Sequence, residues 1–360
     1  MEIIAWIGLS QALLSGFLTL FKKKKSASDR LLSGWLFLLA IEFLTFGLES
    51  NIFPNFILLT NSFLLFNPAL LLYITSLTNP RFKIKAIHLL HLLPYLIFKI
   101  TAWIIEEPQK YETFFDQNNT LWFRIVFVVV ALISWIVYLT LSGIKLTRHR
   151  RIVQNEFSTI DTFKKISWVL LILIVYILYS ITIFIWGLLN MIFPDPLSIT
   201  IFSYSVLLFF IYILGYYGLK QQPLFPAVDF PKPENLTKYK NSLLTTETKI
   251  QIGKKIEKHF KKERPYINPD LNMNLLSEQL NLPKHHITEV LNSHFGKNFF
   301  HFVNQYRIEA VKAKLAEPNN PYSIEAIGFE CGFNSKSTFF SVFKKFTGLT
   351  PTQFKESNKG

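Results

Sequence analysis

Seven long apolar runs follow one another through the first 218 residues of this 360-residue chain, and they limit its fold more than any other feature. A helix needs about 20 apolar residues to cross the hydrocarbon core of a bilayer. Buried helices of a soluble protein rarely repeat so often in succession, so we expect a bundle of seven transmembrane helices. The runs lie at 3–21, 31–49, 55–78, 86–105, 121–143, 166–192 and 197–218.

The charge of the connecting segments sets the expected orientation of this bundle. Lys and Arg cluster after the first, third and fifth runs, as in Lys22–Lys25 and between 144 and 165, whereas the alternate connections carry almost none. Cytoplasmic loops are enriched in Lys and Arg. We therefore expect the amino terminus outside the cell and everything after the seventh run in the cytoplasm.

Two ionisable residues lie deep inside the expected spans. Glu42 lies roughly 16 Å along the second run and Lys99 roughly 20 Å along the fourth, from the rise per residue of a helix. Both runs start on the cytoplasmic side, so the two groups lie at similar depth. A lone charge there costs about 2.5–3.5 kcal/mol, and we predict a pair between Glu42 and Lys99. The alternative is that Lys99 extends outward to the interface while Glu42 is protonated.

The composition changes after residue 218. Four prolines lie between Lys220 and Ser242, and proline interrupts helices. We therefore divide the chain into a membrane domain at 1–218, an extended linker at 219–248 and a polar domain at 249–360. From residue 219 onward, 21 Lys and Arg stand against 13 Asp and Glu, within a net charge of +14 for the whole chain.

The polar part opens with an amphipathic pattern at 245–263. Ile252, Ile256 and Phe260 recur at helical spacing with lysines between them, which predicts a helix. Two interpretations remain open. The helix packs on the following domain, or it forms a contact with a second copy of the chain or with the membrane surface.

A first helix–turn–helix unit is expected at 271–296. Asn272 can cap its first helix, Asn281 suits a left-handed helix end, and Pro283 suits the first turn of a second helix. This layout places a recognition helix in the major groove of DNA. One long helix at 299–316 is expected to connect this unit to the next.

The same layout recurs at 323–348. Ser323 is the expected cap of the first helix and Gly332 its end, while Asn334 and Gly348 are expected to cap and end the second helix. Lysine and serine on the outer face of the second helix of this unit suit phosphates and base edges. The corresponding face of the first unit carries Lys284, His285, Thr288, Glu289 and Asn292. Phe340 on this face either packs locally or contacts a thymine methyl group.

Residues from about 250 to 358 resemble the DNA-binding domain of AraC/XylS-type transcription regulators. The motif "SIEAIGFECGFNSKSTFFSVFKKFTGLTPTQFK" fits the family pattern, notably at Gly332-Phe333, Phe343-Lys344-Lys345 and Thr350-Pro351. The resemblance implies that two recognition helices enter successive major grooves. Base contacts are then predicted for His285, Thr288, Lys336, Ser337, Phe340 and Ser341. Phosphate contacts are predicted for Lys284, Lys297, Arg307, Lys344 and Lys345.

Together these patterns predict an all-α protein: a seven-helix transmembrane bundle in the bacterial cytoplasmic membrane, followed by a cytoplasmic domain with two helix–turn–helix units. The expected function is transcription regulation coupled to a membrane signal. The alternative is a membrane transport or ligand-binding protein with a regulatory tail.

We expect double-stranded DNA and the lipid bilayer as partners. RNA polymerase, an unknown signal ligand and a second copy of the chain are further candidates. We expect neither a cofactor nor enzyme activity, because the chain shows no nucleotide-binding loop or catalytic constellation. Its single cysteine, Cys331, excludes a disulfide within the chain and disfavours a cysteine metal site.

Overall fold

The computed structural model describes residues 2–23, 25–51, 63–79, 81–106, 119–158, 161–190, 196–220, 244–317 and 320–357. Within these ranges the regular structure is helical, with one isolated antiparallel β-bridge between Phe157 and Asn272. The all-α prediction is therefore confirmed. The chain divides into two compact units, of which the first holds residues 1–147 and 167–226 and the second holds 148–166 and 227–360.

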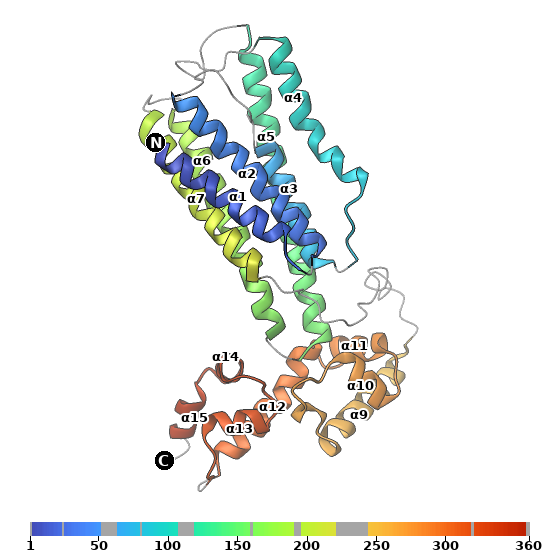
Figure 1. Cartoon of the computed structure of the whole chain (residues 1–360). Coiled ribbons are helices and arrows are strands. Elements are labelled where there is room, and N and C mark those ends of the chain that lie inside the picture. Colours follow the sequence, from blue (N-terminus) through green and yellow to red (C-terminus); the bar gives the residue numbers. More distant parts are fainter. Residues whose placement is uncertain are drawn as a thin grey trace. The chain divides into compact units, whose positions relative to one another are not determined.

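The helices of the first unit coincide with the apolar runs (Figure 1). Six helical stretches among the described residues are long and apolar enough to cross a membrane, and Leu64–Thr78 is a shorter apolar helix. The first part of the third run, 55–62, lies outside the described residues. The helices are α1 (Glu2–Leu20), α2 (Ala27–Asn51), α3 (Phe63–Thr78), the 3₁₀ helix η1 (Ala86–Leu92), α4 (Leu93–Ile104), α5 (Leu121–Glu156), α6 (Asp161–Asn190) and α7 (Pro196–Lys220).

Helix α5 is longer than predicted. A loop was expected from residue 144, but the helix continues to Glu156. Leu146 and Val153 are buried and lie seven residues apart, which places them on one face two turns apart. The helical periodicity thus continues beyond the point where the uninterrupted apolar run ends.

Aromatic side chains form the centre of the first unit. Trp35 of α2 is 1% exposed. Its ring lies 6.3, 6.0 and 5.6 Å from the rings of Tyr73, Tyr176 and Phe210, which come from α3, α6 and α7. Small residues let α1 approach closely, since a Cβ on Gly8 would lie 2.2 Å from the ring of Phe43. Figure 1 shows α1, α2 and α7 side by side.

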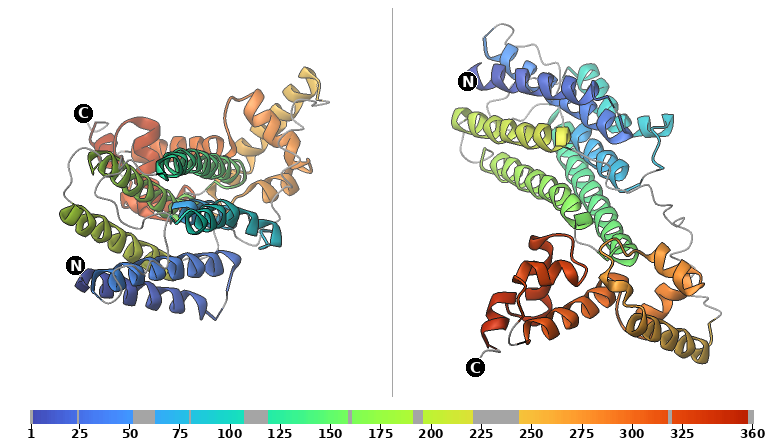
Figure 2. Two further views of the ribbon diagram at one scale, coloured as in Figure 1. Left: turned by 90° about the horizontal axis from the view of Figure 1, so that it is seen from above. Right: turned by 60° about the horizontal axis from the view of Figure 1, so that its bottom comes forward.

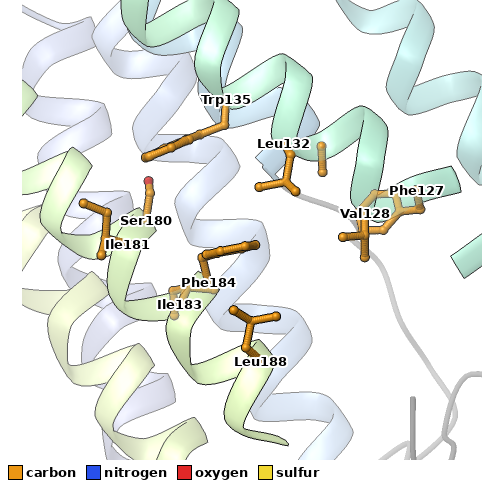
Figure 3. Close-up of a pocket in the computed structure, with 10 residues that line it drawn as sticks. Phe127, Val128, Leu132, Trp135, Ser180, Ile181, Ile183, Phe184 and Leu188 are labelled. Carbon is orange, nitrogen blue, oxygen red and sulfur yellow. The ribbon is translucent and has the colours of Figure 1, made fainter. Parts of the chain in front are cut away.

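A cavity of about 300 Å³ lies between α5 and α6 (Figure 3). Its wall is made mainly of aromatic and aliphatic side chains, among them Phe127, Trp135 and Phe184. The polar Ser180 in this wall donates its hydroxyl to the carbonyl oxygen of Tyr176 at 2.8 Å. The lining residues carry no charge, so the cavity suits an apolar ligand.

The predicted intramembrane pair lies in this unit. Glu42 lies beside α7, where the hydroxyl of Tyr204 donates to its Oε1 at 3.4 Å. Lys99 lies on α4 and is partly exposed. Nothing here tests an ion pair between Glu42 and Lys99, which stays a prediction.

The second unit is organised around α12 (Phe299–Leu315), with a group of helices at each of its ends (Figure 2). A first hydrophobic core includes Leu276, Val290 and Val303, and a second includes Ile308 and Phe343. The predicted linker lies mostly outside the described residues. The remaining helices are α9 (Thr246–Lys262), η3 (Pro265–Ile267), α10 (Met273–Leu280), α11 (Lys284–Ser293), α13 (Ile324–Glu330), α14 (Lys336–Thr347) and α15 (Pro351–Ser357).

Helix α9 packs on the following domain, which was one of the two interpretations left open for 245–263. Ile252, Ile256 and Phe260 are all buried in the first core, and the ring of Phe260 packs 5.0 Å from that of Phe302 in α12. The apolar stripe of this helix is therefore covered by the domain that follows it. That stripe does not remain for a second copy of the chain or for a membrane surface.

Local capping explains where most of these helices begin and end. Asn272 accepts a hydrogen bond from the backbone N–H of Leu275 at 3.1 Å, and Asn281 takes the predicted left-handed conformation. The predicted cap at Asn334 is wrong. Ser335 caps α14 instead, accepting from the N–H of Thr338 at 3.3 Å, because serine and asparagine are nearly equivalent caps.

Gly332 gives a test of how the second unit is assembled. Its φ is +93°, and a Cβ there would lie 2.2 Å from the carbonyl oxygen of Tyr266. Gly348 has a φ of +79° but nothing within 4 Å of such a Cβ. We expect Gly348→Ala to destabilise the unit by about 1–2 kcal/mol from left-handed strain, and Gly332→Ala to destabilise it by clearly more.

The buried thiol of Cys331 provides the measurement. It is 2% exposed, and burial raises the pKa of Cys331 to about 11. As the single cysteine of the chain, it reports unfolding of this unit through its labelling rate in a denaturant titration of the full-length protein. Equal labelling curves for the two variants would contradict the close approach at Gly332.

Candidate nucleic-acid interface

The outer face of α14 is polar and basic. The inner face buries Phe339, Val342 and Phe343 in the second core. The outer side chains are exposed because they follow the same helical period on the opposite side. The exposed residues are Lys336, Ser337, Ser341, Lys344 and Lys345.

Lys336 already has a partner within the protein. Its Nζ lies 2.5 Å from Oε1 of Glu325 on α13, and this hydrogen bond holds the pKa of Glu325 below its usual value. The same ammonium lies 5.7 Å from the ring centre of Phe340. A base contact by Lys336 therefore requires exchange of an exposed ion pair, which costs little.

Phe340 packs locally and remains partly exposed. It lies against the second core, with its ring 5.3 Å from that of Phe339 in an edge-to-face arrangement. Local packing thus accounts for an aromatic residue on this face. The exposed part of the ring leaves a contact with a thymine methyl group as a prediction.

The corresponding face of α11 is less open. His285 is exposed, and its pKa is lowered by burial and by the neighbouring His286. Lys284 is half-buried at the start of the helix. Thr288 is only 8% exposed, and its hydroxyl donates to the carbonyl oxygen of Lys284 at 2.9 Å. Its hydroxyl is directed back to its own helix, so a base contact at Thr288 does not fit this structure.

Three basic side chains gather where α12 begins. His301 lies near Lys297 and Lys345, and the pKa of His301 is lowered by burial and by these two positive charges. Lys297 donates to Oε1 of Gln305. The sequence analysis missed His301. Its spacing of four residues from Lys297 is visible in the sequence, but the approach of Lys345 from α14 is seen only in the fold.

The prediction for Arg307 needs correction, because this side chain is 0% exposed. Its Nε and Nη2 donate to the carbonyl oxygens of Tyr266 and Asn268 at 2.8 and 2.9 Å. Its Nη1 and Nη2 also donate to the carbonyl and hydroxyl oxygens of Ser158 at 3.1 and 3.2 Å. Burial lowers the pKa of Arg307 to about 10. A phosphate cannot reach the guanidinium, and we remove Arg307 from the predicted phosphate contacts.

The parts of the chain that the structure describes contain no group of three or more His, Cys, Asp or Glu side chains placed to hold a metal ion.

Comparison with known proteins identifies the class of this domain. Residues 276–357 match the family described as a helix–turn–helix domain. The carboxy-terminal part of the chain is accordingly a helix–turn–helix domain of the AraC type.

The relatives that match are regulators from bacteria. An uncharacterised HTH-type transcriptional regulator of Staphylococcus aureus (strain COL) is 31% identical over 120 residues, which make up 33% of this chain and 15% of that protein. The uncharacterised transcriptional regulatory protein YesN of Bacillus subtilis (strain 168) is 28% identical over 95 residues, or 26% of each chain. This chain thus covers only a small part of these relatives. No solved structure gives a significant match.

Arg307 is buried and Lys344 is exposed, so their substitutions should have different effects. Arg307→Ala removes four hydrogen bonds to a buried charge and should destabilise the second unit by at least about 2 kcal/mol. Lys344→Ala changes an exposed side chain and should leave stability within about 0.5 kcal/mol while weakening DNA binding. Labelling of Cys331 in denaturant measures the stability of both variants. Wild-type stability for Arg307→Ala would show that its hydrogen bonds do not hold the unit together.

Proposed function

We propose that this protein is a membrane-tethered, sequence-specific DNA-binding transcription regulator that couples a membrane or extracytoplasmic signal to gene expression. The observation that carries the proposal is the exposed basic face of α14, with Ser337, Ser341, Lys344 and Lys345, on an AraC-type domain. Two helix–turn–helix units at the ends of one helix suit two successive major grooves.

The contacts divide into two classes by side chain. Ser337 and Ser341 are short, polar and exposed, so they suit base edges together with His285. Lys297, Lys344 and Lys345 suit phosphates, because a flexible ammonium is a point charge without base preference. The buried residues Thr288 and Arg307 are excluded from both classes on the geometry described above.

The membrane part of the proposal rests on the apolar helices of the first unit and on the charge of their connections. Exposed Arg148, Arg150 and Arg151 at the end of α5 suit the cytoplasmic side of a bacterial inner membrane. With the basic segments inside, the amino terminus lies outside and the DNA-binding domain lies in the cytoplasm. The cavity between α5 and α6 is the candidate site for an apolar signal ligand, and the other partners we propose are the lipid bilayer, DNA, RNA polymerase and a second copy of the chain.

Reporter fusions test the topology. A fusion after residue 115 should report a periplasmic position and a fusion after residue 225 a cytoplasmic one, since basic connections stay inside. Alkaline phosphatase and fluorescent-protein fusions at the same two positions give opposite signals and control for expression. A periplasmic signal at 225 would separate the domain from DNA and overturn the proposed function.

Substitutions on α14 test the division into base and phosphate contacts. Lys345→Ala should weaken binding by a similar factor on all DNA sequences and should reduce the salt dependence of binding. Ser337→Ala should instead change sequence preference, by about 1–3 kcal/mol at one base pair. Selection of bound DNA from a random-sequence pool by the full-length protein in nanodiscs measures both. The assignment fails if Ser337→Ala, like Lys345→Ala, lowers affinity equally on all sequences and leaves the sequence preference unchanged.

A further inference from the structure

The second unit contains a segment from a distant part of the chain. Residues Arg148–Ser158 lie far before the DNA-binding domain in the sequence, yet they belong to the same compact unit as that domain. They comprise the end of α5 and the two residues that follow it. We call Arg148–Ser158 the docking segment.

The end of the docking segment contacts the first helix–turn–helix unit through a β-bridge and a side-chain hydrogen bond. Phe157 forms an antiparallel β-bridge with Asn272, the cap of α10. The hydroxyl of Ser158 donates to the carbonyl oxygen of Leu271 at 2.6 Å. Phe157 and Ser158 are 9% and 1% exposed. The end of the segment is therefore enclosed by the domain.

Ser158 also contacts α12, the helix that connects the two helix–turn–helix units. Asn304 of α12 donates its Nδ2 to the carbonyl oxygen of Ser158 at 2.9 Å, and Nη1 of Arg307 donates to that oxygen at 3.1 Å. Earlier in the segment, Gln154 accepts from Nδ2 of Asn298, the cap of α12, at 3.4 Å. Contacts along α12 thus reach two positions of the docking segment.

Arg307 links the docking segment to both helix–turn–helix units. Its other two hydrogen bonds reach Tyr266 and Asn268 before α10. On the other side, its guanidinium lies 5.8 Å from the ring centre of Phe333, at the turn of the second helix–turn–helix unit. Ser158 supplies two of the four acceptors. Without this residue, buried N–H groups of a charged side chain would lack partners, which is costly in a protein interior.

We infer that the docking segment is an internal ligand of the DNA-binding domain, and that its seating on Arg307 fixes the relative geometry of the two helix–turn–helix units. The second half of this inference rests on the proposed function. Because the segment is continuous with the apolar helices on either side in the sequence, a change in those helices reaches the DNA-binding domain through Ser158.

A disulfide cross-link tests the docking in the full-length protein in native membranes. Residues paired by a β-bridge have Cα atoms about 4.5–5.5 Å apart, which suits a disulfide. In a Cys331→Ala background, Phe157→Cys with Asn272→Cys should form an intrachain bond on mild oxidation, detected by mass spectrometry of the linked peptides. The control pair is Phe157→Cys with Glu356→Cys, which lies on α15 after the second helix–turn–helix unit. This pair should not form a disulfide. No bond in the first pair overturns the docking.

Substitution of Ser158 tests the effect on DNA binding. Ser158→Leu places an apolar side chain beside the buried guanidinium, whereas Asn155→Leu introduces the same side chain at a half-buried position outside the Arg307 site. The probe is DNA selected by the wild-type full-length protein, with either both half-sites or one. Ser158→Leu should lose at least tenfold on the two-site DNA and little on the one-site DNA. Asn155→Leu and the oxidised Phe157→Cys/Asn272→Cys protein should bind both like the wild type.

The outcomes separate the inference from the proposed function. If Ser158→Leu lost affinity equally on one-site and two-site DNA, or bound both like the wild type, the docking segment would have no role in the relative geometry of the two helix–turn–helix units. Absence of DNA binding by the wild type would overturn the proposed function together with that role, while the cross-link still decides whether the segment docks. Protection of the domain from limited proteolysis in Ser158→Leu shows that a loss is not simple unfolding.

Discussion

The guanidinium of Arg307 is the constraint on which the second unit depends. A buried positive charge is tolerated only when hydrogen bonds replace its water, and here four carbonyl or hydroxyl oxygens do so. Two chain segments distant from each other in the sequence supply these oxygens. The position of α12 is thereby tied to the loop before α10 and to Ser158, and Gly332 must lack a side chain for Tyr266 to approach it.

Arg307 is buried, whereas the outer face of α14 is exposed. Arg307 of α12 donates its hydrogen bonds to groups inside the protein, so α12 acts as a support. Lys344 and Lys345 are exposed on α14, and the half-buried Lys297 lies at the start of α12, where it and Lys345 flank His301. In the proposed function, the buried polar groups set the geometry and the exposed ones contact the DNA.

Local signals in the sequence were sufficient for the elements themselves. Asn272, Asn281 and Gly348 mark helix boundaries through capping rules that involve a few neighbouring residues, and the apolar runs predict the long helices by length alone. Asn334 and Ser335 show the limit, since two adjacent residues with equal capping ability leave the helix start uncertain by one position.

The role of Arg307 could not be predicted, because its partners lie far away in the sequence. Arginine on a basic DNA-binding domain suggests a phosphate contact, and only the fold brings Ser158 to within 3.2 Å of it. That distance also bears on how the domain operates. A cut in the linker after residue 220 would free the DNA-binding helices but leave Ser158 behind, so the released domain would keep two of the four acceptors of Arg307. A buried charge with half its partners missing destabilises its surroundings. The hydrogen bonds of Arg307 therefore favour a DNA-binding domain that stays attached to the apolar helices of the first unit.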